Sequence, residues 1–152
     1  MLLRAGDTIS GQEGKATATI DSVIQDMFYV KTLEATLSKE KAEVRAMGKK
    51  GVQHKSTGWS GSGSMSIYYV TSVFRKMALK FAKTGVDTNF TITVVNDDPA
   101  STVGKQTVVL YNCNLDSVIL AKLDAESETL DEDVDFTFDD FDILDSFGNP
   151  II

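Results

Sequence analysis

Histidine and cysteine, two residue types often used in catalysis, each occur once in this 152-residue sequence, and the two stand far apart. His54 is the single histidine, and no second histidine or cysteine pair accompanies it to share a metal ion or a proton transfer. Cys113, the single cysteine, lies in an apolar run and has no partner for an internal disulfide. We therefore interpret His54 as a solvated or interface residue and Cys113 as a small core residue.

Two further patterns match known binding motifs only in part. Asp131, Asp133 and Asp135 have the spacing of the first ligands of a calcium-binding loop. Phe136, however, occupies the position at which that loop needs glycine. Residues 58–63, GWSGSG, lack the Lys-Ser or Lys-Thr ending of a phosphate-binding loop, and we attribute their glycines to flexibility. The sequence therefore predicts no enzyme, no cofactor and no dedicated metal site.

The charges are divided unequally along the chain. The formal net charge is −7, yet residues 1–83 contain 13 basic and 7 acidic side chains, and residues 84–152 contain 2 basic and 15 acidic ones. Such a division favours head-to-tail association between copies, unless the two halves interleave in the fold and no patch survives. No apolar run reaches the roughly 20 residues of a membrane helix, and the first residues lack the apolar core of a signal peptide. We expect synthesis in cytosol-like conditions.

Alternating apolar and polar residues predict a mainly β protein, a β-sandwich or barrel of about eight strands with one flanking amphipathic α-helix. The predicted strands cover residues 15–20, 28–38, 43–46, 64–69, 89–95, 106–112, 117–123 and 133–139. A turn at residues 39–40 separates the second strand from the third. After the last strand, Phe141, Ile143 and Leu144 form a short apolar anchor.

The helix is predicted over residues 71–85. Apolar side chains recur there at helical spacing, and Gly85 suits the left-handed position that ends many helices. We expect this stripe to cover a sheet; its members are Phe74, Met77, Ala78 and Phe81.

A long polar stretch between residues 46 and 64 separates two of the predicted strands. Connections in compact domains usually span about 4–6 residues, and longer ones are often functional. We therefore predict an extended loop that contacts other molecules. Trp59 is its large apolar residue, and we interpret it as an interface anchor, with packing inside the subunit as the alternative. The candidate contact residues are Lys49, Lys50, Gln53, His54, Lys55 and Trp59.

The last predicted strand has one apolar and one acidic face. Asp133, Asp135 and Asp139 lie on the acidic face. A row of carboxylates along one face of a strand is typical of a solvated surface, or of the wall of a space that must not hold anions.

Several segments together make the sequence similar to the tail tube proteins of contractile-tailed phages and PBSX-type defective prophages, whose fold is related to the tube protein of type VI secretion. Their order and spacing carry the resemblance, since no single one is diagnostic. They are residues 9–14 (ISGQEG), 31–36 (KTLEAT), 47–48 (MG), 54–58 (HKSTG), 69–72 (YVTS) and 135–142 (DFTFDDFD).

This resemblance implies a single tube domain over residues 1–152 with a structural role. Such subunits form hexameric rings that stack into a hollow, rigid tube inside a contractile sheath. The implied partners are further copies of the chain, the sheath, the tape-measure protein and the baseplate. The implied place is a virion tail or a phage-tail-like bacteriocin particle, assembled in the cytoplasm of the bacterial host.

The resemblance also implies roles for the two candidate surfaces. The loop over residues 46–64 would reach neighbouring subunits. Asp133, Asp135 and Asp139 would line a lumen through which DNA passes without specific binding, because carboxylates repel phosphate. Two alternatives remain open: the tube of a bacteriocin that carries no DNA, and a monomeric β-sandwich that binds a ligand.

Overall fold

The computed structural model describes residues 2–27 and 29–149. These residues form eight strands, one α-helix and one short 3-10 turn, which confirms the predicted mainly β fold with a single helix. The elements are η1 (Ala5–Asp7), β1 (Gly14–Ile20), β2 (Val23–Asp26), β3 (Val30–Val44), β4 (Gln53–Tyr68), α1 (Val73–Thr84), β5 (Phe90–Asp97), β6 (Lys105–Leu115), β7 (Asp131–Phe138) and β8 (Asp140–Asp145).

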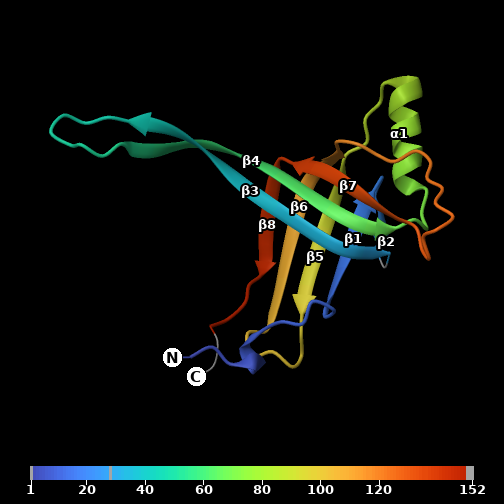
Figure 1. Ribbon diagram of the computed structural model, residues 1–152, viewed down its shortest axis with the longest axis horizontal. Coiled ribbons are helices and arrows are strands. Elements are labelled where there is room, and N and C mark those ends of the chain that lie inside the picture. The colour runs from blue at the N-terminus through green and yellow to red at the C-terminus, as the bar shows by residue number, and fades with distance from the viewer. Residues whose placement is uncertain (1, 28, 150–152) are drawn as a thin grey trace.

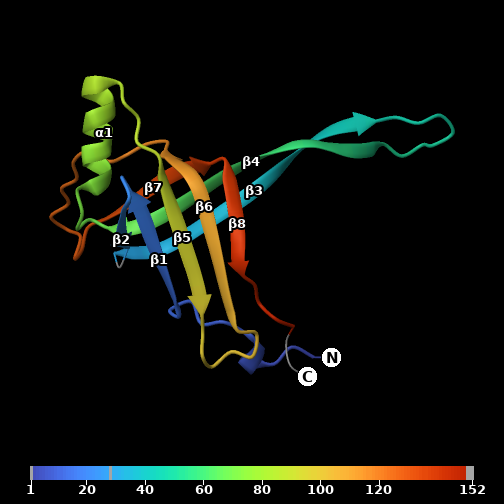
Figure 2. The ribbon, with the colours of Figure 1, turned by 180° about the vertical axis from the view of Figure 1, so that it is seen from behind.

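The strands are arranged in two layers that cross each other (Figure 1). Sheet A contains β2, β1, β5, β6 and β8, and sheet B contains β3, β4 and β7. Strand β6 joins them, because its middle pairs with β8 while Asn114 and Leu115 near its end pair with β7. Seen from behind, sheet A lies in front and the diagonal strands of sheet B pass beneath it (Figure 2).

The core lies between the two sheets, where side chains from each layer meet. Ile92 and Leu110 point inward from sheet A, and Met65 and Phe136 point inward from sheet B. Helix α1 adds Phe74, which is buried against Phe90. Every second residue of β7 is buried, as the period of two along a strand requires.

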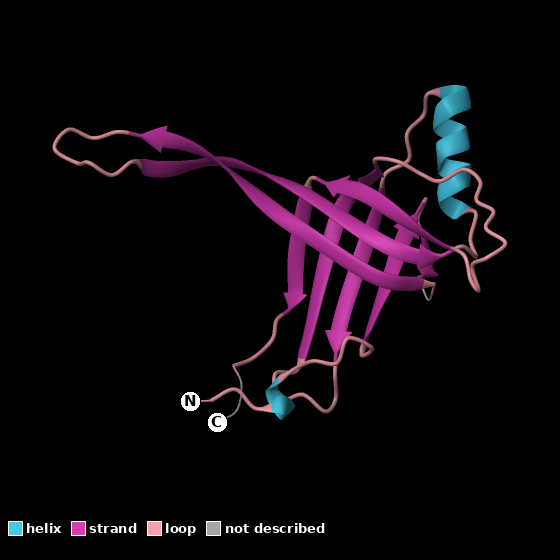
Figure 3. Cartoon of the chain, in the orientation of Figure 1, coloured by secondary structure: helices cyan, strands magenta, loops and turns pink. Residues whose placement is uncertain are grey.

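Strands β3 and β4 form one long hairpin rather than two strands and a loop (Figure 3). Strand β3 continues through the predicted turn at residues 39–40, with a register shift between Glu40 and Lys41. Strand β4 begins at Gln53, so residues 45–52 alone connect the strands. The predicted extended loop over residues 46–64 is therefore wrong for residues 53–64, which are strand.

The aromatic residues of β7 account for the part of this strand around Gly61 and Gly63. A Cβ atom built on Gly61 would lie 2.4 Å from the Phe138 ring, and one built on Gly63 would lie 2.4 Å from the Phe136 ring. The two rings thus cover the strand at positions where any side chain would collide with them, as aromatic residues do for glycines elsewhere in sheets. Gly61 and Gly63 of the GWSGSG segment therefore serve close packing, and our attribution of these two glycines to flexibility is wrong.

The helix agrees with its predicted range, and two other segments differ from theirs. Gly85 ends α1 with a left-handed φ of 73°. The predicted strand over residues 117–123 is wrong: this segment has no regular secondary structure and pairs with no strand in the described chain. The predicted apolar anchor after β7 is instead strand β8, which pairs with β6.

Candidate assembly surfaces

The hairpin divides into two parts at the end of β7. We call residues 30–39 and 59–68 the proximal hairpin, and residues 40–58 the distal hairpin. Pairing between β4 and β7 ends at Gly61 and Phe138, so the distal hairpin has no third strand beside it. Its residues are exposed on both faces, and Figures 1 and 3 show it projecting beyond the two sheets.

Five of the six candidate contact residues lie in the distal hairpin. Lys49 and Lys50 lie in the connecting loop. Gln53, His54 and Lys55 begin β4, where His54 faces Glu43 across the hairpin. With five basic and two acidic residues, this part of the chain keeps its positive charge together after folding. An isolated two-stranded hairpin is marginally stable in water, so this exposed and basic element is suited to contact another molecule.

Trp59 lies apart from those five residues, in the proximal hairpin. Its ring packs against Phe138 at a centroid distance of 6.2 Å and edge-on against Phe141 at 5.6 Å. Its exposed fraction is 39%. Trp59 therefore packs inside the subunit and still presents part of its ring to the outside, and its interface role stays a prediction.

Asp133 and Asp135 lie on the outer face of sheet B. On the neighbouring strand β4, Ser66 lies opposite Asp133 and Ser64 lies opposite Asp135. Glu34 of β3 lies opposite Ser64 on its other side. A shallow groove of about 330 Å³ runs along this face, and its lining includes Glu34, Ser64, Asp116 and Asp135. The face thus combines small hydroxyl groups with carboxylates. Such a surface offers little to an apolar or an anionic chain.

Asp139 lies just past the end of β7, where it accepts a hydrogen bond from the Asn112 side chain. At the opposite end of β7, Asp131 is paired with a cation, because Lys31 Nζ lies 2.7 Å from Asp131 Oδ2. The hydrogen bond from Lys31 lowers the pKa of Asp131 below its usual 3.8, and Asp131 raises the pKa of Lys31 in return. The carboxylates along β7 therefore do not form one uniformly acidic surface.

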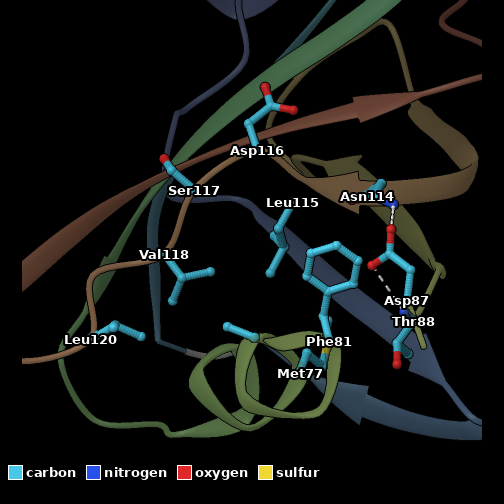
Figure 4. Close-up of a pocket in the computed structure, with 11 residues that line it drawn as sticks. Met77, Phe81, Asp87, Thr88, Asn114, Leu115, Asp116, Ser117, Val118 and Leu120 are labelled. Carbon is cyan, nitrogen blue, oxygen red and sulfur yellow. Dashed lines mark hydrogen bonds between the residues drawn. The ribbon is translucent and has the colours of Figure 1, made fainter. Parts of the chain in front are cut away.

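A second depression lies between α1 and the end of β6 (Figure 4). Its volume is about 330 Å³. We call it the α1 pocket. Phe81 lies in it with 54% of its surface exposed, so the predicted stripe covers the sheet through Phe74 but not through Phe81. Asp87 is held in place by the Asn114 side chain, whose Nδ2 donates to Asp87 Oδ2 at 2.5 Å. The lining of the α1 pocket includes the apolar side chains of Met77, Phe81, Leu115, Val118 and Leu120 and the carboxylates of Asp87 and Asp116.

A buried ion pair, which our reading of the sequence missed, fixes α1 on sheet B. Arg75 Nη1 lies 3.0 Å from Glu132 Oε2, and the Glu132 side chain is fully buried. Arg75 also donates to the carbonyl of Ile119 and lies over the Tyr69 ring. The signal was present in the alternation of β7, where Glu132 takes a position otherwise held by buried apolar residues. A carboxylate there requires a buried partner.

The described residues show no arrangement of three or more His, Cys, Asp or Glu side chains that could hold a metal ion. Burial raises the pKa of the Cys113 thiol to about 12, so this cysteine is a poor nucleophile at neutral pH. In the described part of the chain, no helix has the length and apolar character needed to cross a membrane.

Comparison with known proteins gives one consistent result. A phage-like element PBSX protein, XkdM of Bacillus subtilis (strain 168), is 43% identical over 149 residues, which cover 98% of this chain and 99% of that protein. The fold is similar to a chain of the sheath-tube complex of an extracellular contractile injection system, with a TM-score of 0.68, 14% identity and coverage of 91% and 93% of the two chains.

A chain in the six-fold symmetrised baseplate of the anti-feeding prophage has the same fold, with a TM-score of 0.67, 13% identity and coverage of 95% of this chain and 97% of that one. A family described as phage tail tube protein matches residues 1–145. The chain therefore belongs to the phage tail tube protein family.

Proposed function

We propose that copies of this chain close into hexameric rings, and that the rings stack into a hollow, rigid tube inside a contractile sheath. Membership of the phage tail tube family over residues 1–145 carries this proposal. Two related folds support it, since one belongs to a sheath-tube complex and the other to a six-fold symmetrised baseplate. The protein acts as a structural subunit of a tail particle and catalyses no reaction.

The distal hairpin is the element through which one subunit reaches another. It is exposed on both faces, carries net positive charge and has no third strand, while many acidic residues lie in the second half of the chain. Opposite potentials on separate surfaces steer such contacts and set their register.

The partners that follow from this role are further copies, the sheath protein and the tape-measure and baseplate proteins. Asp133 and Asp135 are our candidates for the lumen wall, with Asp139 beside them. If they line the lumen, changing all three to Lys should leave tube assembly intact and slow the passage of DNA. Loss of assembly would instead place these carboxylates at a contact between subunits.

Electron microscopy of the purified protein tests the main proposal. We expect rings or tubes, and a protein that stays monomeric at high concentration would contradict the proposal and favour a ligand-binding module.

A shortened variant tests the role of the distal hairpin. Because Glu40 pairs with Gly58, residues 41–57 can be replaced by Asn-Gly, a two-residue turn that suits hairpins. We expect this variant to fold and to form no tubes.

A further inference from the structure

The loop over residues 45–52, which we call the hairpin tip, carries exposed apolar side chains among basic ones, and Met47 is the longest of them. Met47 is fully exposed, with an exposed fraction of 104%. Arg45 lies before it, and Lys49 and Lys50 follow it. Methionine is flexible and fills irregular apolar gaps. The tip is therefore suited to an apolar pocket whose edge is acidic.

The α1 pocket has this chemistry. Its apolar side chains include Met77, Phe81 and Leu115, and its volume of about 330 Å³ leaves room for a long side chain. In Figure 4, Asp116 lies on one side of these residues and Asp87 on the other. The lysines of α1 do not line the pocket, so carboxylates are the charged groups in its lining.

The pocket is also incompletely covered by its own chain. Leu120 lines it with 71% of its surface exposed, and it belongs to the segment over residues 117–123, which pairs with no strand in the described chain. An apolar depression bordered by polar groups is typical of a surface that binds another protein.

Tip and pocket cannot meet within one subunit. The tip lies at one end of the molecule, and α1 lies at the other end (Figures 1 and 2). A contact between them must join two copies head to tail, and contacts of this kind generate closed rings or helical arrays.

We propose that the hairpin tip of one copy docks in the α1 pocket of a neighbouring copy. Met47 fills the apolar interior, while Lys49 and Lys50 pair with Asp87 and Asp116. This proposal rests on the proposed function, because it needs copies that assemble, and it assigns the acceptor site for the distal hairpin.

Cysteine cross-linking tests the contact in assembled particles. In a variant with Met47→Cys and Ser117→Cys, one cysteine lies at the tip and the other at the exposed edge of the pocket. Oxidation, or a short bismaleimide reagent, is expected to give a ladder of covalent oligomers on a denaturing gel. The native Cys113 is fully buried, so it does not compete.

The matched control pairs Met47→Cys with Ser146→Cys, which follows the end of β8, and Figure 1 shows this end of β8 far from α1. This pair is expected to give no ladder. Tubes that form without a ladder from the first pair, or with equal ladders from both pairs, would overturn the docking and leave the tube function standing. Absence of tubes from the unmodified protein would instead count against the tube function.

Charge reversal gives a second test. Lys49→Glu with Lys50→Glu is expected to raise the concentration needed for assembly by at least about tenfold, because like charges then face each other. Adding Asp87→Lys and Asp116→Lys to the same chain should restore most of the loss. The same pocket changes should not rescue Lys41→Glu with Lys55→Glu, a pair placed on the strands of the distal hairpin. Failure of the first rescue, with a folded protein, would contradict the docking.

Discussion

The proximal and distal hairpins share their two strands but differ in what lies beside them. The proximal hairpin has β7 as a third strand, and the Phe136 and Phe138 rings cover its glycines. The distal hairpin has no such neighbour, and its side chains are exposed on both faces. Polar sequences rich in glycine can thus form strands in either setting. Packing against β7 stabilises only the proximal hairpin inside the subunit. The distal hairpin therefore remains available to contact a partner.

The largest expected effect comes from the buried ion pair at the base of the proximal hairpin. Glu132 pairs with Ile67 of β4 and carries the counter-charge of Arg75. Glu132→Gln leaves the Arg75 charge without a full partner, and we expect a loss of about 3 kcal/mol in the free energy of unfolding. Urea denaturation measures this loss.

A matched change in the distal hairpin serves as the control. Glu43→Gln alters an exposed carboxylate, and we expect a change within about 0.5 kcal/mol. A double variant, Arg75→Met with Glu132→Leu, should recover most of the stability because no buried charge remains. Equal losses from Glu132→Gln and Glu43→Gln would remove the distinction between the two parts of the hairpin.

The second-largest expected effect is the loss of stability on substituting a glycine of β4, and it differs between two glycines of that strand. A Cβ on Gly63 would lie 2.4 Å from the Phe136 ring and 2.8 Å from the carbonyl oxygen of Glu34, which is backbone and cannot easily move. We expect Gly63→Ala to destabilise the protein by about 2 kcal/mol through overpacking. Thermal denaturation measures the change.

Gly58 is the matched control in the distal hairpin. The nearest atom to a Cβ built there is Glu40 Oε2 at 3.5 Å, which is an ordinary contact. Gly58→Ala should leave stability unchanged or raise it by about 0.5 kcal/mol, because alanine has less freedom in the unfolded chain. A cost at Gly58 equal to that at Gly63 would mean that ring packing does not explain the proximal glycines.

The smallest effect concerns the link between β3 and β7. The hydrogen bond from Lys31 lowers the pKa of Asp131 in the folded state. A lowered pKa contributes stability above the unfolded-state pKa, and this contribution disappears as the pH falls through the folded-state pKa. Wild type should therefore exceed Asp131→Asn slightly in stability at pH 7, and the gap should close at pH values below 3.8.

Urea titrations at several pH values measure this gap, and Lys31→Gln serves as the partner variant. Combined with Asp131→Asn, it should add little, because both changes remove the same interaction. A gap that stays constant from pH 7 into the acid range would show that the ion pair does not cause it.

The elements with a clear local period were predictable from the sequence. The alternation of Val134, Phe136 and Phe138 predicted β7, and the helical spacing from Phe74 onward predicted α1. The exposure of Asp133 and of the lysines around Met47 also agrees with their sequence patterns, while their roles in a lumen wall or a contact stay predictions. The α1 pocket was not, because residues far apart in the sequence form it.

By itself, the sequence determined the mainly β class, the position of the helix and, through its similarity to known tube proteins, the family. These depend on side-chain period and on residue identity, which are local properties. Only the tertiary structure decided that residues 53–64 are strand, because they pair with β3 and because rings from β7 lie over Gly61 and Gly63. It also decided that a basic tip and an acidic pocket lie at opposite ends of one subunit, since the order of the chain does not set the distance between surfaces.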